Sequence, residues 1–268
     1  MTGWSGFAVV ACTSAVALAV LQTVTFVAAV RVRRYNVVDV VWGPGFVLVA
    51  LAAVLVGDAA NPRAWILVAL TGVWGCRLGW HMARKTGGRG EDPRYSEMLA
   101  RAGGGRATAA RKIFATQGAA QWFVSLPIQV SAVAGPTSGA GWAVVTVGVA
   151  LWLLGVVFET VGDRQLAAFR ADPEHGAVMD RGLWAWTRHP NYFGDACVWW
   201  GVWLVAASAW PGMLTVASPA VMTYFLVFAT GARLLERSMV GRPGYREYQR
   251  RTSMFVPWPP GSRRCGSS

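Results

Sequence analysis

Long apolar segments restrict the possible folds of this chain more than any other feature of its sequence. Seven segments of about 20 residues are dominated by apolar side chains, and each is long enough to cross a ~30 Å hydrocarbon layer as one helix. They are residues 7–30, 37–56, 64–83, 113–134, 142–162, 192–210 and 212–232. Because only 14% of the 268 residues are charged and the mean hydropathy is +0.38, a soluble domain is excluded. The sequence predicts an all-α polytopic integral membrane protein with seven transmembrane helices.

The basic residues predict the orientation of these helices. Nearly all of the 25 Lys and Arg residues lie in the first, third and fifth loops and in the C-terminal tail. Arg63 lies in an opposite loop, and Arg77 lies within a predicted helix. By the positive-inside rule, the N-terminus lies outside and the C-terminus in the cytoplasm. The preference for Arg over Lys, with much Ala, Gly and Val, indicates a bacterial protein and hence the bacterial cytoplasmic (inner) membrane.

The net charge of +12 has the same origin. Excess arginine often indicates nucleic-acid binding, but here it follows membrane topology and contact with anionic lipid. We therefore expect membrane lipids as partners and no nucleic acid. The four cysteines show no paired spacing, so no metal site is expected.

The segment RGLWAWTRHPNYFGD, residues 181–195, carries the densest group of reactive side chains. Pro190 is suited to begin the apolar helix that follows, because its missing N–H would have no helical partner there. A helix N-terminus favours anions through its unpaired N–H groups and its dipole. The segment therefore predicts a site for an anionic cofactor at the cytoplasmic membrane surface. Its candidate binding residues are Arg188, His189, Asn191, Tyr192 and Asp195.

Two acidic residues lie at the cytoplasmic end of the fifth predicted helix. Glu159 and Asp163 are one turn apart, and Arg170 follows them. A carboxylate within a membrane helix normally faces the bundle interior or a water-filled cavity. One interpretation is a helix-end carboxylate paired with a neighbouring arginine, and the other is a polar pocket shared with the RHPNY segment. We favour the shared pocket, because Arg170 leads directly into that segment.

The N-terminal half offers fewer polar side chains within its helices. Asp39 lies in the first turn of the second predicted helix, where the dipole alone would stabilise it; alternatively, it protonates or orients a substrate. Helical spacing places Trp74, Arg77, His81 and Arg84 on one face of the third helix. Arg77 either extends to the membrane surface or pairs with an internal carboxylate, Asp39 or Glu159.

The C-terminal tail combines aromatic and basic side chains. Glu236 precedes RPGYREYQRRTSMFVPWPP, in which Tyr245, Tyr248 and Trp258 alternate with arginines. The arginines could bind lipid head groups. Together with the aromatic planes, they also suit an adenine ring and a phosphate.

Five parts of the chain together carry a family pattern. They are VDVVWGPGF, WGCRLGWHMARK with RGEDPRY, FETVGDRQLAAFR, RGLWAWTRHPNYFGD and RPGYREYQRRTSMFVPWPP, within residues 36–260. In these parts the sequence resembles the steroid 5-alpha-reductase superfamily, most closely its uncharacterised bacterial branch of seven-helix membrane proteins. The RHPxY element by itself is shared with the isoprenylcysteine carboxyl methyltransferases.

The resemblance implies NADPH-dependent reduction of a carbon–carbon double bond in a hydrophobic substrate, which is sterol-like, an enone or a lipid. Within one membrane domain, 1–268, it implies a substrate side in residues 1–134 and a cofactor side in residues 142–260. Glu159 falls where the steroid enzymes have an asparagine. The RHPNY segment and the tail add further candidates. The cofactor residues are thus Glu159, Asp163, Arg170, Arg188, His189, Asn191, Tyr192, Asp195, Glu236 and Tyr248.

On the substrate side, Asp39 lies near the position of the steroid enzymes' substrate-side acid, whereas Trp74 replaces their partner tyrosine. An indole donates a hydrogen bond but does not deliver a proton, so either Asp39, His81 or water is the proton source, or the substrate is not a 3-oxosteroid. The candidate catalytic residues are Asp39, Trp74 and Arg77. Two other functions stay open: an S-adenosylmethionine-dependent methyltransferase of a lipid or prenylated carboxylate, and a non-catalytic membrane protein. Asn191 with the following YFGD favours the reductase.

Overall fold

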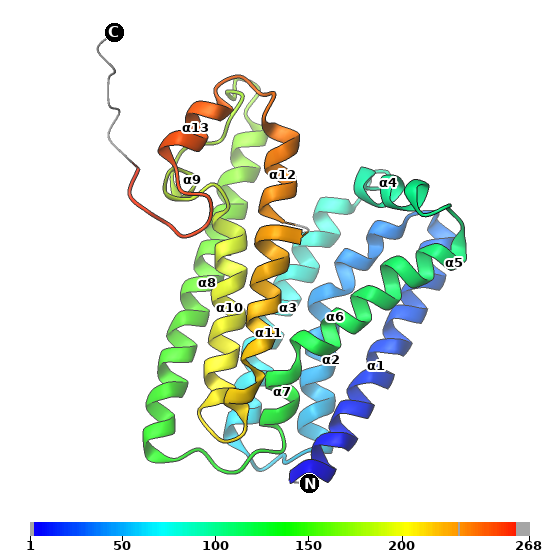
Figure 1. Ribbon diagram of the computed structural model, residues 1–268, viewed down its shortest axis with the longest axis vertical. Coiled ribbons are helices and arrows are strands. Elements are labelled where there is room, and N and C mark those ends of the chain that lie inside the picture. The colour runs from blue at the N-terminus through cyan, green and yellow to red at the C-terminus, as the bar shows by residue number, and fades with distance from the viewer. Residues whose placement is uncertain (1–2, 230, 261–268) are drawn as a thin grey trace. The chain divides into compact units, whose positions relative to one another are not determined.

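The computed structural model describes residues 3–229 and 231–260, and this part of the chain is mainly helical (Figure 1). No strand occurs in the described ranges, where one isolated bridge joins Thr187 to Ser253. The α-helices are α1 Gly3–Val32, α2 Val38–Val56, α3 Pro62–Thr86, α4 Pro93–Arg101, α5 Arg106–Ala109, α6 Thr116–Val124, α7 Leu126–Ser131, α8 Gly139–Ala171, α9 Leu183–Trp186, α10 Pro190–Ala207, α11 Ala217–Tyr224, α12 Ala232–Met239 and α13 Tyr245–Arg251. Short 3-10 or π segments adjoin them: η1 Tyr35–Val37, η2 Ala110–Ala115, η3 Gly212–Val216 and η4 Phe225–Ala229. The predicted all-α class is confirmed.

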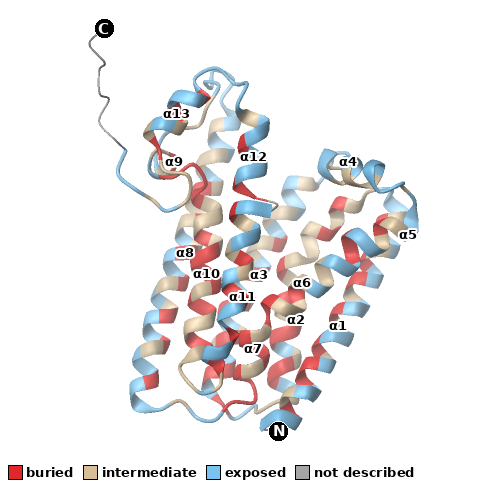
Figure 2. Ribbon diagram, in the orientation of Figure 1, coloured by how far each residue is buried: buried red, intermediate tan, exposed pale blue. Residues whose placement is uncertain are grey.

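Helix length and outward-facing apolar side chains identify a membrane protein. Among the described residues, four stretches are long and apolar enough to cross a membrane: Gly3–Val32, Tyr35–Val56, Gly139–Ala171 and Gly212–Met239. Large apolar side chains are exposed along α1 and α8, as Val20 (58%) and Leu153 (52%) illustrate (Figure 2). Such a surface would favour association in water, whereas lipid accommodates it. The seven crossings and the orientation stay predictions.

The fourth predicted span, residues 113–134, is not one continuous helix. η2 and α6 run through its first part, and the chain turns at Ser125 before α7 begins. Pro127 stands at the start of α7, where its missing N–H and its ring prevent α6 from continuing. The last predicted span is likewise irregular, because η3 and η4 flank α11. Apolar composition therefore located these segments without predicting their regularity.

The contacts within the chain divide it into two compact units. Unit 1 comprises Met1–Thr146 with Val202–Ser218, and unit 2 comprises Val147–Gly201 with Pro219–Ser268. The three candidate catalytic residues belong to unit 1, and all the predicted cofactor residues belong to unit 2.

In unit 1, small residues let α2 and α3 approach each other closely. A Cβ atom on Gly75 would lie 2.6 Å from the carbonyl oxygen of Gly43, so a larger side chain would separate the helices. Gln121 of α6 donates to the carbonyl of Trp42 in α2 at 2.8 Å and accepts from Gln22 of α1 at 2.7 Å. A buried amide chain thus ties three helices together.

In unit 2, glycines spaced seven residues apart bring α8 and α10 into close contact. A Cβ atom on Gly194 would lie 2.5 Å from the carbonyl oxygen of Gly155. A Cβ atom on Gly201 would lie 2.6 Å from the carbonyl oxygen of Gly148. Seven residues are about two helical turns, so the glycines of each helix share one face. This seam places the polar side chains at the ends of α8 and α10 next to each other.

Arg63, which the sequence places apart from the other basic residues, is fully buried in the first turn of α3. Its guanidinium donates to the hydroxyls of Ser131 (2.8 Å) and Thr137 (2.7 Å). It also donates to the backbone carbonyls of Ser131 (3.2 Å) and Gly135 (3.0 Å). These groups lie at and just beyond the end of α7, where helix carbonyls lack a helical partner. Arg63 therefore caps the C-terminus of α7.

Candidate functional site

The predicted cofactor residues of α8 and α10 meet where these two helices adjoin. α10 begins at Pro190, as the sequence predicts. Asn191 donates from Nδ2 to Oδ1 of Asp163 on α8, 3.5 Å away and 28 residues distant in sequence. Its own Oδ1 accepts from the N–H of Tyr192 at 3.1 Å. The structure thus brings the FETVGD and RHPNY segments together through Asp163 and Asn191.

The other acidic and basic residues of this face differ in burial. Glu159, one turn before Asp163, is 5% exposed. Asp195 is half-buried, and Arg170 is exposed in the last turn of α8. The predicted contacts of these residues with a cofactor stay predictions.

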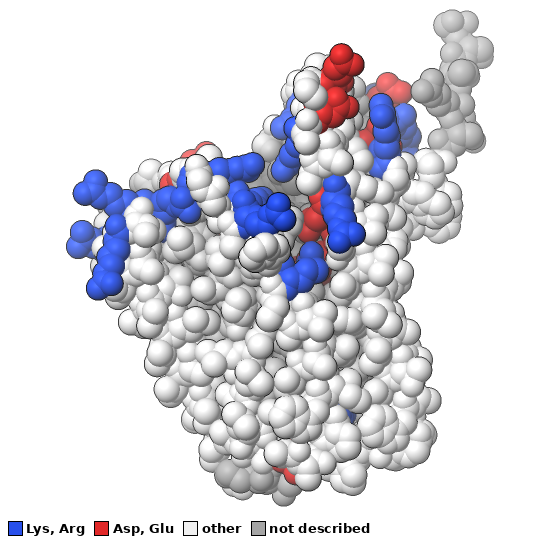
Figure 3. Space-filling model, turned by 180° about the vertical axis from the view of Figure 1, so that it is seen from behind, with Lys and Arg blue, Asp and Glu red and all other residues white. Residues whose placement is uncertain are grey.

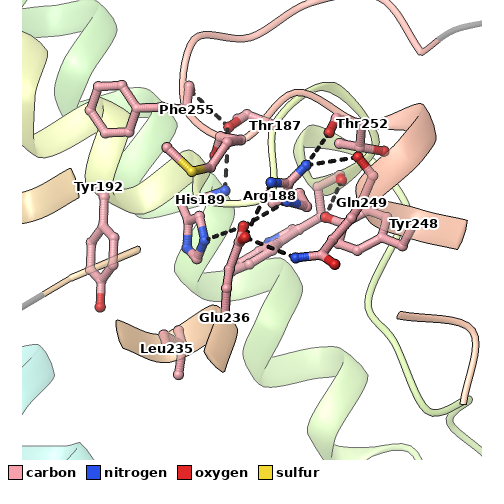
Figure 4. Close-up of polar contacts among 12 residues, drawn as sticks. Thr187, Arg188, His189, Tyr192, Leu235, Glu236, Tyr248, Gln249, Thr252 and Phe255 are labelled. Carbon is pink, nitrogen blue, oxygen red and sulfur yellow. Dashed lines mark hydrogen bonds and ion pairs between the residues drawn. The ribbon is translucent and has the colours of Figure 1, made fainter. Parts of the chain in front are cut away.

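The guanidinium of Arg188 is held by protein groups at all three of its nitrogens (Figure 4). Nε donates to Oε1 of Glu236 at 2.6 Å and Nη2 donates to Oε2 at 3.2 Å, which makes a bidentate ion pair. Nη1 donates to the carbonyls of Gln249 (3.0 Å) and Thr252 (2.5 Å). Arg188 is 9% exposed and Glu236 is 8% exposed. The charge of Arg188 is therefore balanced inside unit 2.

His189 and Gln249 complete the surroundings of the Glu236 carboxylate. Nε2 of His189 lies 3.1 Å from Oε1, and Nε2 of Gln249 donates to Oε2 at 3.0 Å. The ring of His189 stacks on that of Tyr192, with centroids 5.5 Å apart and planes 6° apart. We call Arg188, His189, Glu236, Gln249 and Thr252 the tail clasp, because they join the start of α10 to α12 and to the tail. Figure 4 shows the side chains of Arg188, His189 and Gln249 gathered around the carboxylate of Glu236.

The segment before α10 and the segment after α13 run side by side. The N–H of Arg188 donates to the carbonyl of Ser253 at 2.8 Å, next to the bridge at Thr187. The hydroxyl of Tyr248 donates to the carbonyl of Trp184 at 2.6 Å. Burial raises the pKa of the Tyr248 phenol well above its ordinary value, so the phenol stays a hydrogen-bond donor at neutral pH. Tyr248 therefore anchors α13 to α9.

A pocket of about 440 Å³ opens beside the tail. Its lining residues are Arg250, Arg251, Thr252, Ser253, Val256, Trp258 and Pro259. Arg251 pairs with Asp180, whereas Arg250 is exposed and Trp258 is 72% exposed. An accessible indole beside guanidinium groups is the combination that suits an adenine ring and a phosphate.

In unit 1, Asp39 lies in the first turn of α2, as the sequence predicts. Its Oδ1 accepts a hydrogen bond from the hydroxyl of Tyr95 in α4 at 2.6 Å. Nη2 of Arg94 lies 3.9 Å from its Oδ2. Burial, and next the negative charge of Asp39, raise the pKa of the Tyr95 phenol well above its ordinary value. The phenol therefore carries its proton at neutral pH.

The segment RGEDPRY is attached to η1, just before α2, by hydrogen bonds that involve the backbone. Glu91 accepts from the N–H groups of Tyr35 (2.5 Å) and Asn36 (3.0 Å). In return, Arg34 donates to the carbonyl of Arg89 at 2.6 Å. These contacts set the position from which Tyr95 reaches Asp39.

The third-helix residues lie in one continuous helix, α3. Trp74 is 1% exposed, and its ring centroid lies 5.9 Å from that of Phe46. Arg77 and His81 are half-buried. Trp74 therefore belongs to the packed core of unit 1.

Sequence reasoning missed the role of Tyr95. It noted this residue only as the end of RGEDPRY and did not connect it with Asp39, 56 residues away. A tyrosine three residues after an acidic pair, Glu91 and Asp92, was the available signal. The pairing itself depends on two segments that no periodicity relates.

The comparison with protein families covers most of the chain. A model of proteins of unknown function, DUF1295, matches residues 25–252. The chain belongs to this family. No curated protein and no solved structure matches it. The DUF1295 match includes every predicted site residue from Asp39 to Tyr248, and it ends before Trp258 of the tail pocket.

Proposed function

We propose that this DUF1295 protein is an NADPH-dependent reductase of a carbon–carbon double bond in a hydrophobic substrate, which is sterol-like, an enone or a lipid. It acts as a seven-helix protein of the bacterial cytoplasmic membrane, with its N-terminus outside and its arginine-rich loops in the cytoplasm. The resemblance of its motifs to the steroid 5-alpha-reductase superfamily suggests this reaction. The contact that supports it is the hydrogen bond between Asn191 and Asp163, which joins two of those motifs.

Unit 2 contains two groups of side chains that fit an anionic dinucleotide. The accessible Arg250 and Trp258 of the tail pocket suit the adenosine and its phosphates, through guanidinium contacts and stacking. Asp163 and Asn191 offer a carboxylate and an amide to the polar nicotinamide and ribose groups. When bound, NADPH supplies the hydride.

We assign a positioning role to the tail clasp. The guanidinium of Arg188 is already engaged by Glu236 and by two backbone carbonyls. Arg188, His189 and Glu236 therefore hold the start of α10 and the tail together. This attachment fixes the chain that continues from Thr252 into the tail pocket.

Reduction of an enone also needs a donor at the oxygen, where negative charge develops. Trp74 cannot deliver a proton, but the phenol of Tyr95 can. Asp39 accepts the proton of this hydroxyl in a 2.6 Å hydrogen bond, which fixes the position of the phenol oxygen. We assign Tyr95 and Asp39 as one donor pair: the O–H of Tyr95 turns from the carboxylate to the substrate oxygen and protonates it, and a proton from water restores the phenol.

Ligand-dependent thermal unfolding of the purified protein in detergent tests the cofactor. A ligand at 100 times its Kd stabilises the folded state by about 2.7 kcal/mol, so saturating NADPH should raise the apparent Tm by several degrees. Asn191→Ala should abolish this shift without changing the elution profile or the Tm of the protein alone. A shift with S-adenosylmethionine and none with NADPH would overturn the reductase in favour of the methyltransferase.

The tail pocket has a matched pair of variants. Arg250→Gln removes a guanidinium from the pocket, and Arg246→Gln removes one from the same helix outside it. The first should reduce the NADPH shift and the second should leave it unchanged. Equal effects of the two would mean that the adenosine binds elsewhere.

Turnover requires the substrate, which lipid profiling of a deletion strain can supply as an accumulated unsaturated compound. Asp39→Asn and Tyr95→Phe should both stop NADPH oxidation with that compound. Both should keep the NADPH-induced Tm shift, because they lie outside the cofactor residues. Undiminished turnover by Tyr95→Phe would remove Tyr95 from the mechanism.

A further inference from the structure

A groove of about 410 Å³ lies in unit 1, where the last turns of α1 adjoin α5 and the beginning of η2. Its lining residues are Phe26, Val27, Val30, Arg31, Arg106, Ala107 and Ala110. Phe26, Val27 and Val30 make one wall apolar, and the two alanines leave the opposite wall without bulky side chains. The groove therefore accepts a slender apolar group.

Two guanidinium groups accompany this apolar wall. Arg31 lies in the last turn of α1, and Arg106 is the first residue of α5. Both side chains are exposed, and neither pairs with a carboxylate within residues 3–229 and 231–260. Figure 3 shows Lys and Arg side chains gathered at one end of the face it displays. The site thus combines two positive charges with an apolar channel.

The position of Arg31 on α1 relates the groove to the bilayer. α1 is a candidate membrane span that ends at Val32, so Arg31 lies at the level of the lipid head groups. Val27 and Phe26, about one turn deeper, lie at the level of the acyl chains. The π segment η2 begins in the opposite wall, and π segments are frequent at functional sites.

We propose that this groove binds one anionic phospholipid of the phosphatidylglycerol type. Its phosphate contacts Arg31 and Arg106, and one acyl chain lies against Phe26, Val27 and Val30. The charge of the site and the order of its charged and apolar parts along α1 match such a lipid. A free phosphate would use the guanidinium groups and leave the apolar wall without a ligand.

Thermal unfolding in mixed detergent–lipid micelles tests the proposal. Dioleoyl-phosphatidylglycerol should raise the apparent Tm more than dioleoyl-phosphatidylcholine, which has the same acyl chains and no net charge. The double variant Arg31→Gln with Arg106→Gln should lose most of this difference. At about 1 kcal/mol for each arginine near a membrane surface, the apparent affinity for the anionic lipid should fall about 30-fold.

Two further variants separate the groove from general surface charge. The control is the double variant Arg33→Gln with Arg111→Gln, which removes the same charge just after α1 and in η2, at positions outside the groove. It should keep the full effect of phosphatidylglycerol on the Tm. Ala110→Leu keeps both arginines and narrows the groove, and it should also reduce the effect. If Ala110→Leu does not fold, the arginine pair still decides, because both arginines are exposed.

Three results would overturn the proposal. The first is an equal loss of the phosphatidylglycerol effect on the Tm in the double variant of the groove (Arg31, Arg106) and in the control double variant (Arg33, Arg111). This result would show that only general surface charge matters. The second is an equal stabilisation by inorganic phosphate, which would make the apolar wall irrelevant. The third is a dimer of the unaltered protein in native mass spectrometry that becomes a monomer in the double variant Arg31→Gln with Arg106→Gln. The occupant of the groove would then be a second copy of the chain.

Discussion

Glu236→Gln removes the carboxylate of the tail clasp and keeps the shape of the side chain. In the protein, this carboxylate accepts from Arg188 at 2.6 and 3.2 Å and from Gln249 at 3.0 Å, and it lies 3.1 Å from His189. A glutamine keeps one acceptor oxygen and places an NH₂ group where the other oxygen was. That NH₂ group faces Arg188 and either His189 or Gln249, to which it offers no acceptor in place of the lost oxygen. Arg188 would then carry a buried charge without a counter-ion.

The magnitude follows from burial. The side chains of Arg188 and Glu236 are 9% and 11% exposed, so solvent screens their interaction weakly. Breaking a buried ion pair by removing one partner costs about 3–5 kcal/mol. For a chain of this length, the Tm shifts by about 2–4 °C for each kcal/mol. We therefore expect Glu236→Gln to lower the apparent Tm by about 6–20 °C in differential scanning fluorimetry.

The tail provides a second readout. Arg250 and Arg251 are trypsin sites that directly precede Thr252 of the clasp, so loss of the clasp should speed cleavage there. Glu247→Gln is the matched control, because it removes the same charge from an exposed position on α13. It should change stability by no more than about 0.5 kcal/mol.

A double-mutant cycle with Arg188→Met isolates the pair itself. Removing both partners should cost less than the sum of the two single changes, by about 1–3 kcal/mol. Additive single effects would refute the coupling on which the reasoning rests. So would a Glu236→Gln protein with the Tm and tryptic pattern of the unaltered chain.

The remaining predictions concern packing, capping and pH. Gly155→Ala introduces a Cβ 2.5 Å from the carbonyl of Gly194 and should cost about 1–3 kcal/mol, whereas Gly176→Ala, with nothing within 4 Å, should be neutral; thermal melts compare the two. Arg63→Gln leaves carbonyls beyond α7 without donors, costs about 2–4 kcal/mol, and should reduce the monodisperse fraction recovered in detergent. Asp92→Ala removes the N-cap of α4 and should cost about 1 kcal/mol at pH 7. Hydrogen bonding to the arginine two residues later lowers the pKa of Asp92 below the unfolded value of about 3.9. Its contribution is therefore complete above that pH and is lost as the pH falls through the folded pKa; hydrogen exchange in α4 should show a difference that shrinks on acidification, and a growing one would contradict the assignment.

Segmental composition was sufficient to predict several of the long helices. α1, α2 and α8 cover predicted spans, and α10 begins at Pro190 as predicted. The interruption of the fourth span was readable from Pro127 but was overlooked, because apolar composition averages over a segment and does not register the missing N–H of one residue.

The site was predicted less completely. The expected proximity of the FETVGD and RHPNY segments is present in the contact of Asp163 with Asn191. Arg188 is different: it was expected at a cofactor, and its guanidinium is occupied by Glu236 and the backbone near Thr252. A guanidinium offers the same fork of donors to a carboxylate and to a phosphate, so residue type does not reveal its partner.

The sequence by itself determined that this chain is helical, that it belongs in a membrane, and that its basic residues concentrate in alternate loops and the tail. Only the tertiary structure decided which group each buried charge contacts: Tyr95 for Asp39, the end of α7 for Arg63, and Glu236 for Arg188. The physical reason is one of range. Burial of apolar surface follows from the composition of each segment, whereas a buried charge is stabilised by a group within about 3 Å, and the folded chain alone determines which distant segment supplies it.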